Sequence, residues 1–255
     1  MKIMLTRLVL VTGFLFLLPS IYGCATTGET ANEIERLNKE VADLKRQVAV
    51  LNRQVDELSG GSKVQRRPHA SLSVSFAGNP KLGNKDAKIA MVEFSDYQCP
   101  FCRRYHGQTF DRIKQRYVDN GKLLYVYRDF PLPSHRQAPM ASVAANCAGQ
   151  QGAYWEMQRS LYLPSAQLNR GYYLSIARQL GLKLEKYETC LADSRQLDQV
   201  SRDTRYDASL GIRGTPAFFI GRIDGEKIVD ITPVIGAQPL SAFVHAIDQV
   251  LARVK

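Results

Sequence analysis

Residues 92–102 are Val92-Glu-Phe-Ser-Asp-Tyr-Gln-Cys-Pro-Phe-Cys102, an apolar run that leads directly into two cysteines separated by two residues. The pattern around them predicts a strand over 87–95 and a helix over 101–120. A sulfur at the first turn of a helix faces unpaired backbone N–H groups and the positive end of the helix dipole, and both stabilise a thiolate. Because the thiolate is the form that exchanges with disulfides, Cys99 and Cys102 are predicted to be a reactive pair.

A metal site is an alternative for this spacing, because zinc sites also use two cysteines separated by two residues. Such sites usually add a second pair of this kind or paired histidines. Cys147 and Cys190 are single, and the four histidines are dispersed, at positions 69, 106, 135 and 245. We therefore expect no metal and no cofactor, and a metal-binding module is kept only as an alternative function.

The composition is that of an ordinary globular protein, with 45% hydrophobic and 23% charged residues in a chain of 255. The formal net charge is +10, but Lys and Arg are scattered from Lys2 to Lys255 and no basic run exceeds two residues. A nucleic-acid interface needs a clustered basic stripe, so we expect no nucleic-acid partner.

Strand and helix patterns alternate over residues 72–255 in an order typical of an α/β domain. Further strands are predicted at 71–76, 123–130, 215–220 and 227–233, and a last helix at 240–254. Residues from about 134 to 210 are rich in Ala, Leu, Gln and Arg at helical spacing. They predict a large helical insertion between the third and fourth strands.

Three segments occur in a fixed order along this domain: Val92–Cys102, then Arg128-Asp-Phe-Pro-Leu132 with His135 and Ala138, then Gly214-Thr-Pro-Ala-Phe-Phe219. Together they resemble the DsbA-like branch of the thioredoxin superfamily, and the resemblance covers roughly residues 73–255. It implies a thioredoxin fold with a helical insertion. It also implies that the chain is a thiol:disulfide oxidoreductase.

The resemblance assigns roles to the motif residues. Cys99 matches an exposed nucleophile, and Cys102 matches the buried cysteine that resolves mixed disulfides. Pro216 matches a cis-proline held beside the two cysteines, a segment that would otherwise be interpreted as an ordinary turn. In this family the backbone of Thr215 pairs with an extended substrate segment, a form of β-strand addition. The residues expected to contact substrate are Pro100, Phe101, Thr215 and Pro216.

Glu93 lies six residues before Cys99 on the predicted strand. Its offset matches the buried acid of thioredoxin-like proteins, which passes protons to and from the resolving cysteine. The alternative is that the alternation of the strand turns Glu93 to solvent. We expect the buried position, which makes Glu93 the third catalytic residue.

Cys147 and Cys190 both fall in the predicted helical insertion. In an oxidising compartment they most simply pair as a structural disulfide, because the short gap singles out Cys99 and Cys102 as the other pair. The alternative is a buried free thiol at each position.

Residues 1–23 have the layout of a secretory signal, with Lys2 and Arg7 before an apolar run over 8–18. The ending Ile21-Tyr-Gly-Cys24 resembles a bacterial lipobox, whose cysteine is lipidated and starts the mature chain. We therefore expect a lipidated tether at 24–30 and a position on the periplasmic face of a bacterial membrane. The outer membrane is preferred because Ala25, not Asp, follows the cysteine. The alternative is an ordinary signal peptide, in which case Cys24 is left without a role.

Residues 31–59 carry apolar side chains in a strict 3-4 alternation, with Ile or Val at each a position and Leu at each d position. Thr30-Ala-Asn-Glu33 has the form of a capping box, so the helix is expected to start at Thr30. This pattern predicts a coiled coil that joins copies of the chain into a dimer or trimer. The alternative is a helix packed along the globular domain. Residues 60–71 lose all periodicity and predict a linker.

The predicted function is thiol:disulfide exchange on exported proteins, with an unidentified membrane protein as redox partner. Pro100-Phe101 lacks the histidine found in strongly oxidising DsbA proteins, and an N-terminal oligomeriser resembles disulfide isomerases. Oxidation therefore stays open beside isomerisation or reduction. An envelope structural lipoprotein with a passive thioredoxin-fold module is the alternative from another class, although such a module needs neither the cysteine pair nor a cis-proline.

Overall fold

The computed structural model describes residues 27–58, 72–163 and 166–254. They fall into two units, Met1–Gln65 and Arg66–Lys255. The predicted signal peptide, Cys24 and the linker at 60–71 lie outside the described residues. Within the described ranges, no helix is both long enough and apolar enough to cross a membrane.

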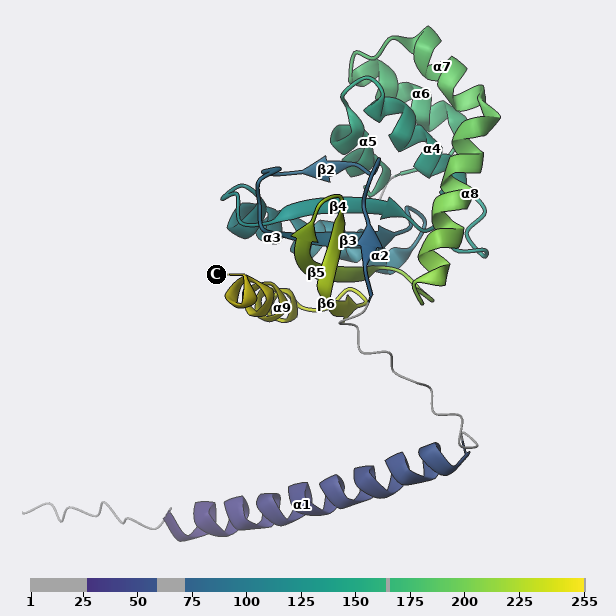
Figure 1. Cartoon of the computed structure of the whole chain (residues 1–255). Helices are drawn as coiled ribbons and strands as arrows, with labels where there is room; N and C mark the ends of the chain where they lie inside the picture. The colour runs from purple at the N-terminus through teal and green to yellow at the C-terminus, as the bar shows by residue number, and fades with distance from the viewer. Residues whose placement is uncertain (1–26, 59–71, 164–165, 255) are drawn as a thin grey trace, which may run out of the picture. The chain divides into compact units, whose positions relative to one another are not determined.

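The first unit contains the helix α1 (Thr27–Leu58), drawn at the purple end of the chain in Figure 1. The prediction that it starts at Thr30 is wrong, because no proline at 27–29 stops the helix from extending by three further residues. The apolar side chains of its middle turns are exposed by 46–59%. They are Ile34, Leu37, Val41, Leu44 and Val48.

The second unit is built on a six-stranded sheet in the order β1-β6-β5-β3-β4-β2. Its strands are β1 (Val74–Ser75), β2 (Lys81–Leu82), β3 (Ile89–Ser95), β4 (Leu124–Asp129), β5 (Ala217–Asp224) and β6 (Lys227–Ile235). The central strand β3 is buried along its whole length, parallel to β4 and antiparallel to β5. The two-residue strand β2 was not predicted, because a strand this short carries no period-2 pattern.

One face of the sheet is covered by two helical segments that are far apart in sequence. The first runs without a break through α2 (Pro100–Tyr105), η2 (His106–Phe110), α3 (Asp111–Ile113) and η3 (Lys114–Val118), of which η2 and η3 are π-helical. The second is α9 (Leu240–Arg253). Ile89, Met91 and Phe218 of the sheet form a common core with Tyr105 and Phe243 of these helices. Burial of this face holds the N-terminus of α2 at the end of β3.

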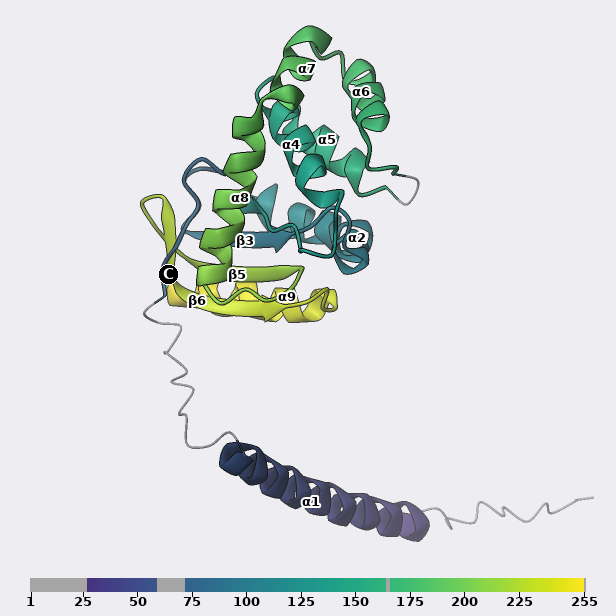
Figure 2. The same cartoon turned by 90° about the vertical axis from the view of Figure 1, so that its right-hand side faces the viewer.

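The helical insertion lies between β4 and β5 and gathers at one side of the sheet (Figure 1). Its helices are α4 (Ala138–Gly149), α5 (Tyr154–Leu161), α6 (Arg170–Gln179), α7 (Leu184–Ala192) and α8 (Ser194–Ser209). Figure 2 shows α8 running from the insertion back to the sheet, where Arg128 Nε of β4 donates to Asp207 Oδ1 of α8 at 2.7 Å. The core of the insertion also includes Cys99 and Cys102, so the cysteine pair lies where the insertion meets the sheet.

Candidate active site

Cys99 is the residue that caps the N-terminus of α2. It has extended backbone geometry, and Pro100 follows at the first helical position, where a missing N–H costs nothing. The backbone N–H of Cys99 donates to the carbonyl oxygen and to Oδ1 of Asp96, both at 3.1 Å. Cys99 and Cys102 are both free thiols in this structure. The turn after β3 therefore places the first sulfur over the open end of the helix.

The surroundings of Cys99 favour its thiolate. The hydrogen bond from Cys102 has the largest effect and lowers the pKa of Cys99. The Thr215 side chain and the N–H groups of Cys102 and Phe101 act in the same direction, burial acts against them, and the pKa falls from 9.0 to about 5. The Thr215 hydroxyl is buried and has no hydrogen-bond partner in the described part of the chain, so it is free to donate to the Cys99 thiolate. A low thiol pKa keeps the nucleophile charged at neutral pH.

Cys99 is covered more fully than the sequence suggested. Its residue surface is only 3% exposed, so the prediction of an exposed nucleophile is wrong. The cause is the turn before β5, because Cys99 Sγ donates to the carbonyl oxygen of Thr215 at 3.4 Å. The Thr215–Pro216 peptide bond is cis, and Pro216 is buried. Among the residues expected to meet substrate, Phe101 is 53% exposed, and Pro100 is exposed beside it.

Cys102 differs sharply from Cys99. It is completely buried on α2. Burial raises the pKa of its thiol well above the ordinary value, and the neighbouring Cys99 and Glu93 raise it further, whereas a hydrogen bond with Ser95 acts in the opposite direction. The pair therefore combines one sulfur that ionises easily with one that holds its proton.

Glu93 lies on β3 with its side chain 0% exposed, which excludes the alternative of a solvent-facing carboxylate. It shares its face of the strand with Ile89 and Met91. Its Oε1 lies 3.0 Å from His106 Nε2, and its Oε2 accepts a hydrogen bond from the Tyr125 hydroxyl. A buried carboxylate with two partners on the same side of the sheet as Cys102 can exchange protons with its surroundings.

Asp96 organises the site, although the sequence did not single it out. Its carboxylate is buried and accepts the backbone N–H groups of Gln98 at 2.7 Å and Cys99 at 3.1 Å. The other oxygen accepts the N–H of Leu132 and lies beside His135 Nδ1, each at 2.8 Å. An aspartate just before a turn commonly accepts backbone N–H groups two and three residues later, so the contacts with Gln98 and Cys99 follow a known pattern. No local sequence pattern predicts the contacts with Leu132 and His135.

A cavity of about 670 Å³ opens beside the cysteine turn. Phe101, Arg104 and Tyr105 line it from α2, and Thr215 and Pro239 line it from the opposite side. The cavity thus lies between α2 and the cis-proline turn. Among the described residues, no group of three or more His, Cys, Asp or Glu side chains could hold a metal ion.

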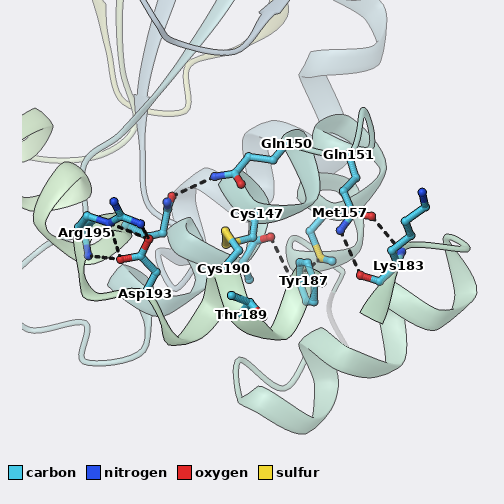
Figure 3. Close-up of a disulfide and its surroundings, with 12 residues drawn as sticks. Cys147, Gln150, Gln151, Met157, Lys183, Tyr187, Thr189, Cys190, Asp193 and Arg195 are labelled. Atoms are coloured by element: carbon cyan, nitrogen blue, oxygen red, sulfur yellow. Dashed lines mark hydrogen bonds and ion pairs between the residues drawn. A yellow bond between two sulfur atoms is a disulfide. The ribbon is translucent and has the colours of Figure 1, made fainter. Parts of the chain in front are cut away.

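The second pair of cysteines lies inside the insertion. Cys147 of α4 and Cys190 of α7 form a disulfide, with their Cα atoms 5.7 Å apart and a separation of 43 positions in sequence (Figure 3). Beside it, the Tyr187 hydroxyl donates to the carbonyl oxygen of Ala144 at 3.1 Å. The bond ties two helices of the insertion together, away from Cys99 and Cys102.

Known proteins resemble the second unit along most of its length. The model of a family described as Thioredoxin matches residues 77–248. The structure of alpha-DsbA1 from Wolbachia pipientis superimposes with a TM-score of 0.63 and 26% identity, covering 69% of this chain and 92% of that one. A thioredoxin-like oxidoreductase from Silicibacter pomeroyi gives a TM-score of 0.56 and 28% identity over 69% of this chain and 93% of that one. These similarities confirm the predicted thioredoxin fold with a helical insertion.

Among curated sequences, Na(+)/H(+) antiporter NhaA 3 of Salinispora tropica is 32% identical over 167 residues, which are 64% of this chain. The matched region is only 24% of the antiporter. The chain thus spans about a quarter of the length of this relative.

Proposed function

The chain belongs to the thioredoxin family, in its DsbA-like branch, and we propose that it catalyses thiol–disulfide exchange through Cys99 and Cys102. The observation that carries this proposal is the asymmetry of the two thiols. The pKa of Cys99 is lowered to about 5, whereas burial raises that of Cys102. One sulfur is thus prepared for attack and the other for a later, separate step.

In the oxidising direction, a client thiolate attacks Cys99 Sγ of the Cys99–Cys102 disulfide. The bond between the two cysteines breaks, and Cys102 leaves as a thiolate that takes up a proton. A second client thiolate then displaces Cys99, so the client gains a disulfide and the enzyme gains two electrons. In the reducing direction, Cys99 attacks a client disulfide and Cys102 releases the client by closing the pair.

The clients are proposed to be exported proteins, bound as extended segments against the cis-proline turn. The exposed Phe101 and the cavity beside Thr215 give such a segment an apolar surface and a backbone to pair with. A membrane protein would then restore the redox state of the cysteine pair after each turnover.

Oxidation of clients is the direction that the geometry of the cysteine pair favours. Stabilising the Cys99 thiolate stabilises the reduced form of the pair, and a stable reduced form makes the disulfide form a stronger oxidant. The Cys102 thiol, and after it the Thr215 side chain and two backbone N–H groups, supply that stabilisation without the histidine that Pro100-Phe101 lacks.

Isomerisation is a second candidate, favoured by α1. The apolar side chains from Ile34 to Val48 have no partner among the described residues of their unit, and they follow the a and d positions of a coiled coil. Ion pairs such as Glu35 with Lys39, at 2.9 Å, join side chains within the helix. We propose that α1 associates with α1 of one or two further copies, which brings several cysteine pairs to one misfolded client.

The experiment on α1 compares two doubly substituted chains. Leu37→Asp with Leu44→Asp places charges at two d positions and should yield monomers by light scattering. Ala42→Asp with Ala49→Asp adds the same charges at exposed b positions and should leave the oligomer intact. If isomerisation depends on the oligomer, only the first chain loses the ability to rescue scrambled ribonuclease. An unchanged mass for the first chain would remove the coiled-coil proposal.

Anchoring is proposed from the sequence at Cys24. A lipid on this residue would hold the domain at the periplasmic face of the outer membrane. Cys24→Ser should release the protein from the membrane fraction, and mass spectrometry of the wild-type N-terminus should find the acyl groups. An unmodified Cys24 in purified membranes would contradict the proposal.

The exchange reaction itself is tested by trapping. Cys102→Ser removes the resolving thiol, so client proteins should accumulate as mixed disulfides with Cys99 that a reducing agent releases. Equilibration of the wild-type pair with glutathione then gives its reduction potential, which separates an oxidant from an isomerase or reductase. Absence of any trapped client would favour the passive structural module instead.

A further inference from the structure

His106 links the buried Glu93 to the outside of the domain. It lies one turn after Cys102, at the start of η2, with its Nε2 3.0 Å from Glu93 Oε1. Its ring stacks on that of Tyr162, with the ring centres 4.1 Å apart and the planes 12° from parallel. Phe110 packs at 5.1 Å on the same ring. The imidazole is therefore held in one orientation toward the carboxylate.

The other side of His106 faces a cavity of about 470 Å³ between η2 and α5. Its Nδ1 makes no hydrogen bond to the described residues, and it is not fully buried. Because His106 lines the cavity, water there can reach this nitrogen. Asp111, Lys114, Glu156 and Arg159 also line this cavity. The cavity thus has polar side chains that can bind water.

The exchange reaction needs such a connection. Cys102 must lose its proton before it can attack the mixed disulfide, and must regain one when it leaves in the reverse reaction. Both Cys102 and Glu93 are completely buried, so neither contacts bulk water. Tyr125, the other partner of Glu93, is buried as well and lines none of the cavities described here. Of the two partners of Glu93, His106 is the one that reaches the cavity.

We propose that His106 is a positioning residue that carries protons between Glu93 and water in the cavity, and so sets the rate at which Cys102 is ionised or reprotonated. This inference rests on the proposed exchange reaction. When Cys102 resolves a mixed disulfide, its proton passes to Glu93, then to one nitrogen of His106, while the other nitrogen releases a proton to water. The new Cys99–Cys102 bond forms, the bond from Cys99 to the client breaks, and the client sulfur takes a proton from solvent.

The imidazole is suited to this role because it can donate to a charged carboxylate and accept from a protonated one through the same contact. The buried titratable groups around Glu93 and His106 are Tyr97, Cys102, Tyr105, Tyr125, Tyr127 and Tyr162. The charged groups that line the cavity with His106 are Asp111, Lys114, Glu156 and Arg159. Two acids and two bases line it, so no single sign of charge dominates around the imidazole.

The test separates attack from resolution with the dithionitrobenzoate disulfide as probe. The full chain carries Cys24→Ser, so that Cys99 and Cys102 are the free thiols. Attack by Cys99 releases one equivalent of thionitrobenzoate, and resolution by Cys102 releases the second. His106→Gln keeps a hydrogen bond to Glu93 but cannot relay a proton. It should slow the second release by about 10- to 100-fold near pH 7 and leave the first within about twofold.

Three further readouts distinguish a relay from a structural role. The deficit of His106→Gln should shrink at high pH, where hydroxide can accept the proton, and added imidazole should restore the second release in His106→Gly. The control His245→Gln, on the exposed side of α9, should behave as wild type. A wild-type second release in His106→Gln at every pH, or a deficit that neither high pH nor imidazole relieves, would overturn the proposal. Failure of the first release in the wild-type chain would instead overturn the proposed function.

Discussion

The second unit contains two pairs of cysteines, of which one is a pair of free thiols and the other forms a disulfide. Cys99 and Cys102 are separated by two residues at the N-terminus of α2 and are free thiols. Cys147 and Cys190 are 43 residues apart, on α4 and α7, and are joined. The first pair lies among hydroxyl, carboxylate and backbone N–H groups. Cys147, in contrast, lies in a helix whose buried residues are mostly alanines.

The difference shows that the surroundings and the loop length decide whether a pair of cysteines forms a structural disulfide or a reactive one. A bond that closes a long loop removes much conformational freedom from the unfolded chain, so it stabilises the fold. A bond across two residues removes little. What the short pair has instead is a set of hydrogen-bond donors that stabilise a thiolate, which makes its bond easy to break and remake.

The largest expected effect comes from removing the reactive sulfur of the short pair. Cys99→Ser should lower the rate of insulin reduction by about 10³-fold or more, because Cys102 is buried and holds its proton. Its urea unfolding midpoint at neutral pH should fall below that of the reduced wild type, because serine cannot supply the stability that the Cys99 thiolate adds. Appreciable thiol–disulfide exchange by Cys102 alone would contradict the assignment of Cys99 as the reactive sulfur of the short pair.

The long pair should show the opposite result. Replacing Cys147 and Cys190 together by alanine should lower the free energy of unfolding by about 3–4 kcal/mol, the stabilisation expected for a loop of this length. Insulin reduction below the unfolding transition should remain within a few-fold of wild type. Loss of exchange activity in a chain that is still folded by circular dichroism would mean that the two pairs are coupled.

The pH dependence sharpens the contrast. With a pKa of about 5, the rate of alkylation of Cys99 should be flat at neutral pH and fall about tenfold for each pH unit below 5. Because the folded pKa lies below the ordinary 9.0, the thiolate adds stability to the reduced fold. That contribution is complete above pH 9.0 and is lost as the pH falls through about 5. A midpoint near 9 in the alkylation profile would contradict this assignment.

The smallest effect is expected at Thr215, whose side chain is one of the groups that lower the pKa of Cys99. Thr215→Val keeps the shape of the side chain and should move the midpoint of the alkylation profile upward by about one pH unit. The matched change Thr204→Val removes a hydroxyl that donates to the Val200 carbonyl on α8 and should not move it. Equal profiles for both variants would show that Cys102 and the backbone N–H groups stabilise the Cys99 thiolate without the Thr215 hydroxyl.

The features that sequence could predict are those with a local pattern. The strands β3 and β4 and the helix after Cys99 follow from apolar periodicity and from the cysteine spacing. The contacts of Asp96 with Leu132 and His135 could not be predicted, because these partners lie 36 and 39 residues further along the chain. The burial of Cys99 depends on Thr215, which is 116 residues away. The motif at 214–219 places Pro216 beside the cysteines, but no local pattern gives the individual contacts or the burial that results from them.

The cover over Cys99 has a consequence for the chemical selectivity of the site. A charged sulfur at neutral pH is open to damage by small oxidants such as peroxide, which convert it to sulfenic and then sulfinic acid. In this structure the Thr215 carbonyl and the turn around it leave the residue only 3% exposed. The sulfur is thus nucleophilic, but the turn that covers it limits which molecules can reach it. A client that pairs with the Thr215 backbone would bind at the turn that covers the sulfur, so the partner that reaches the thiolate is also the one that reacts with it.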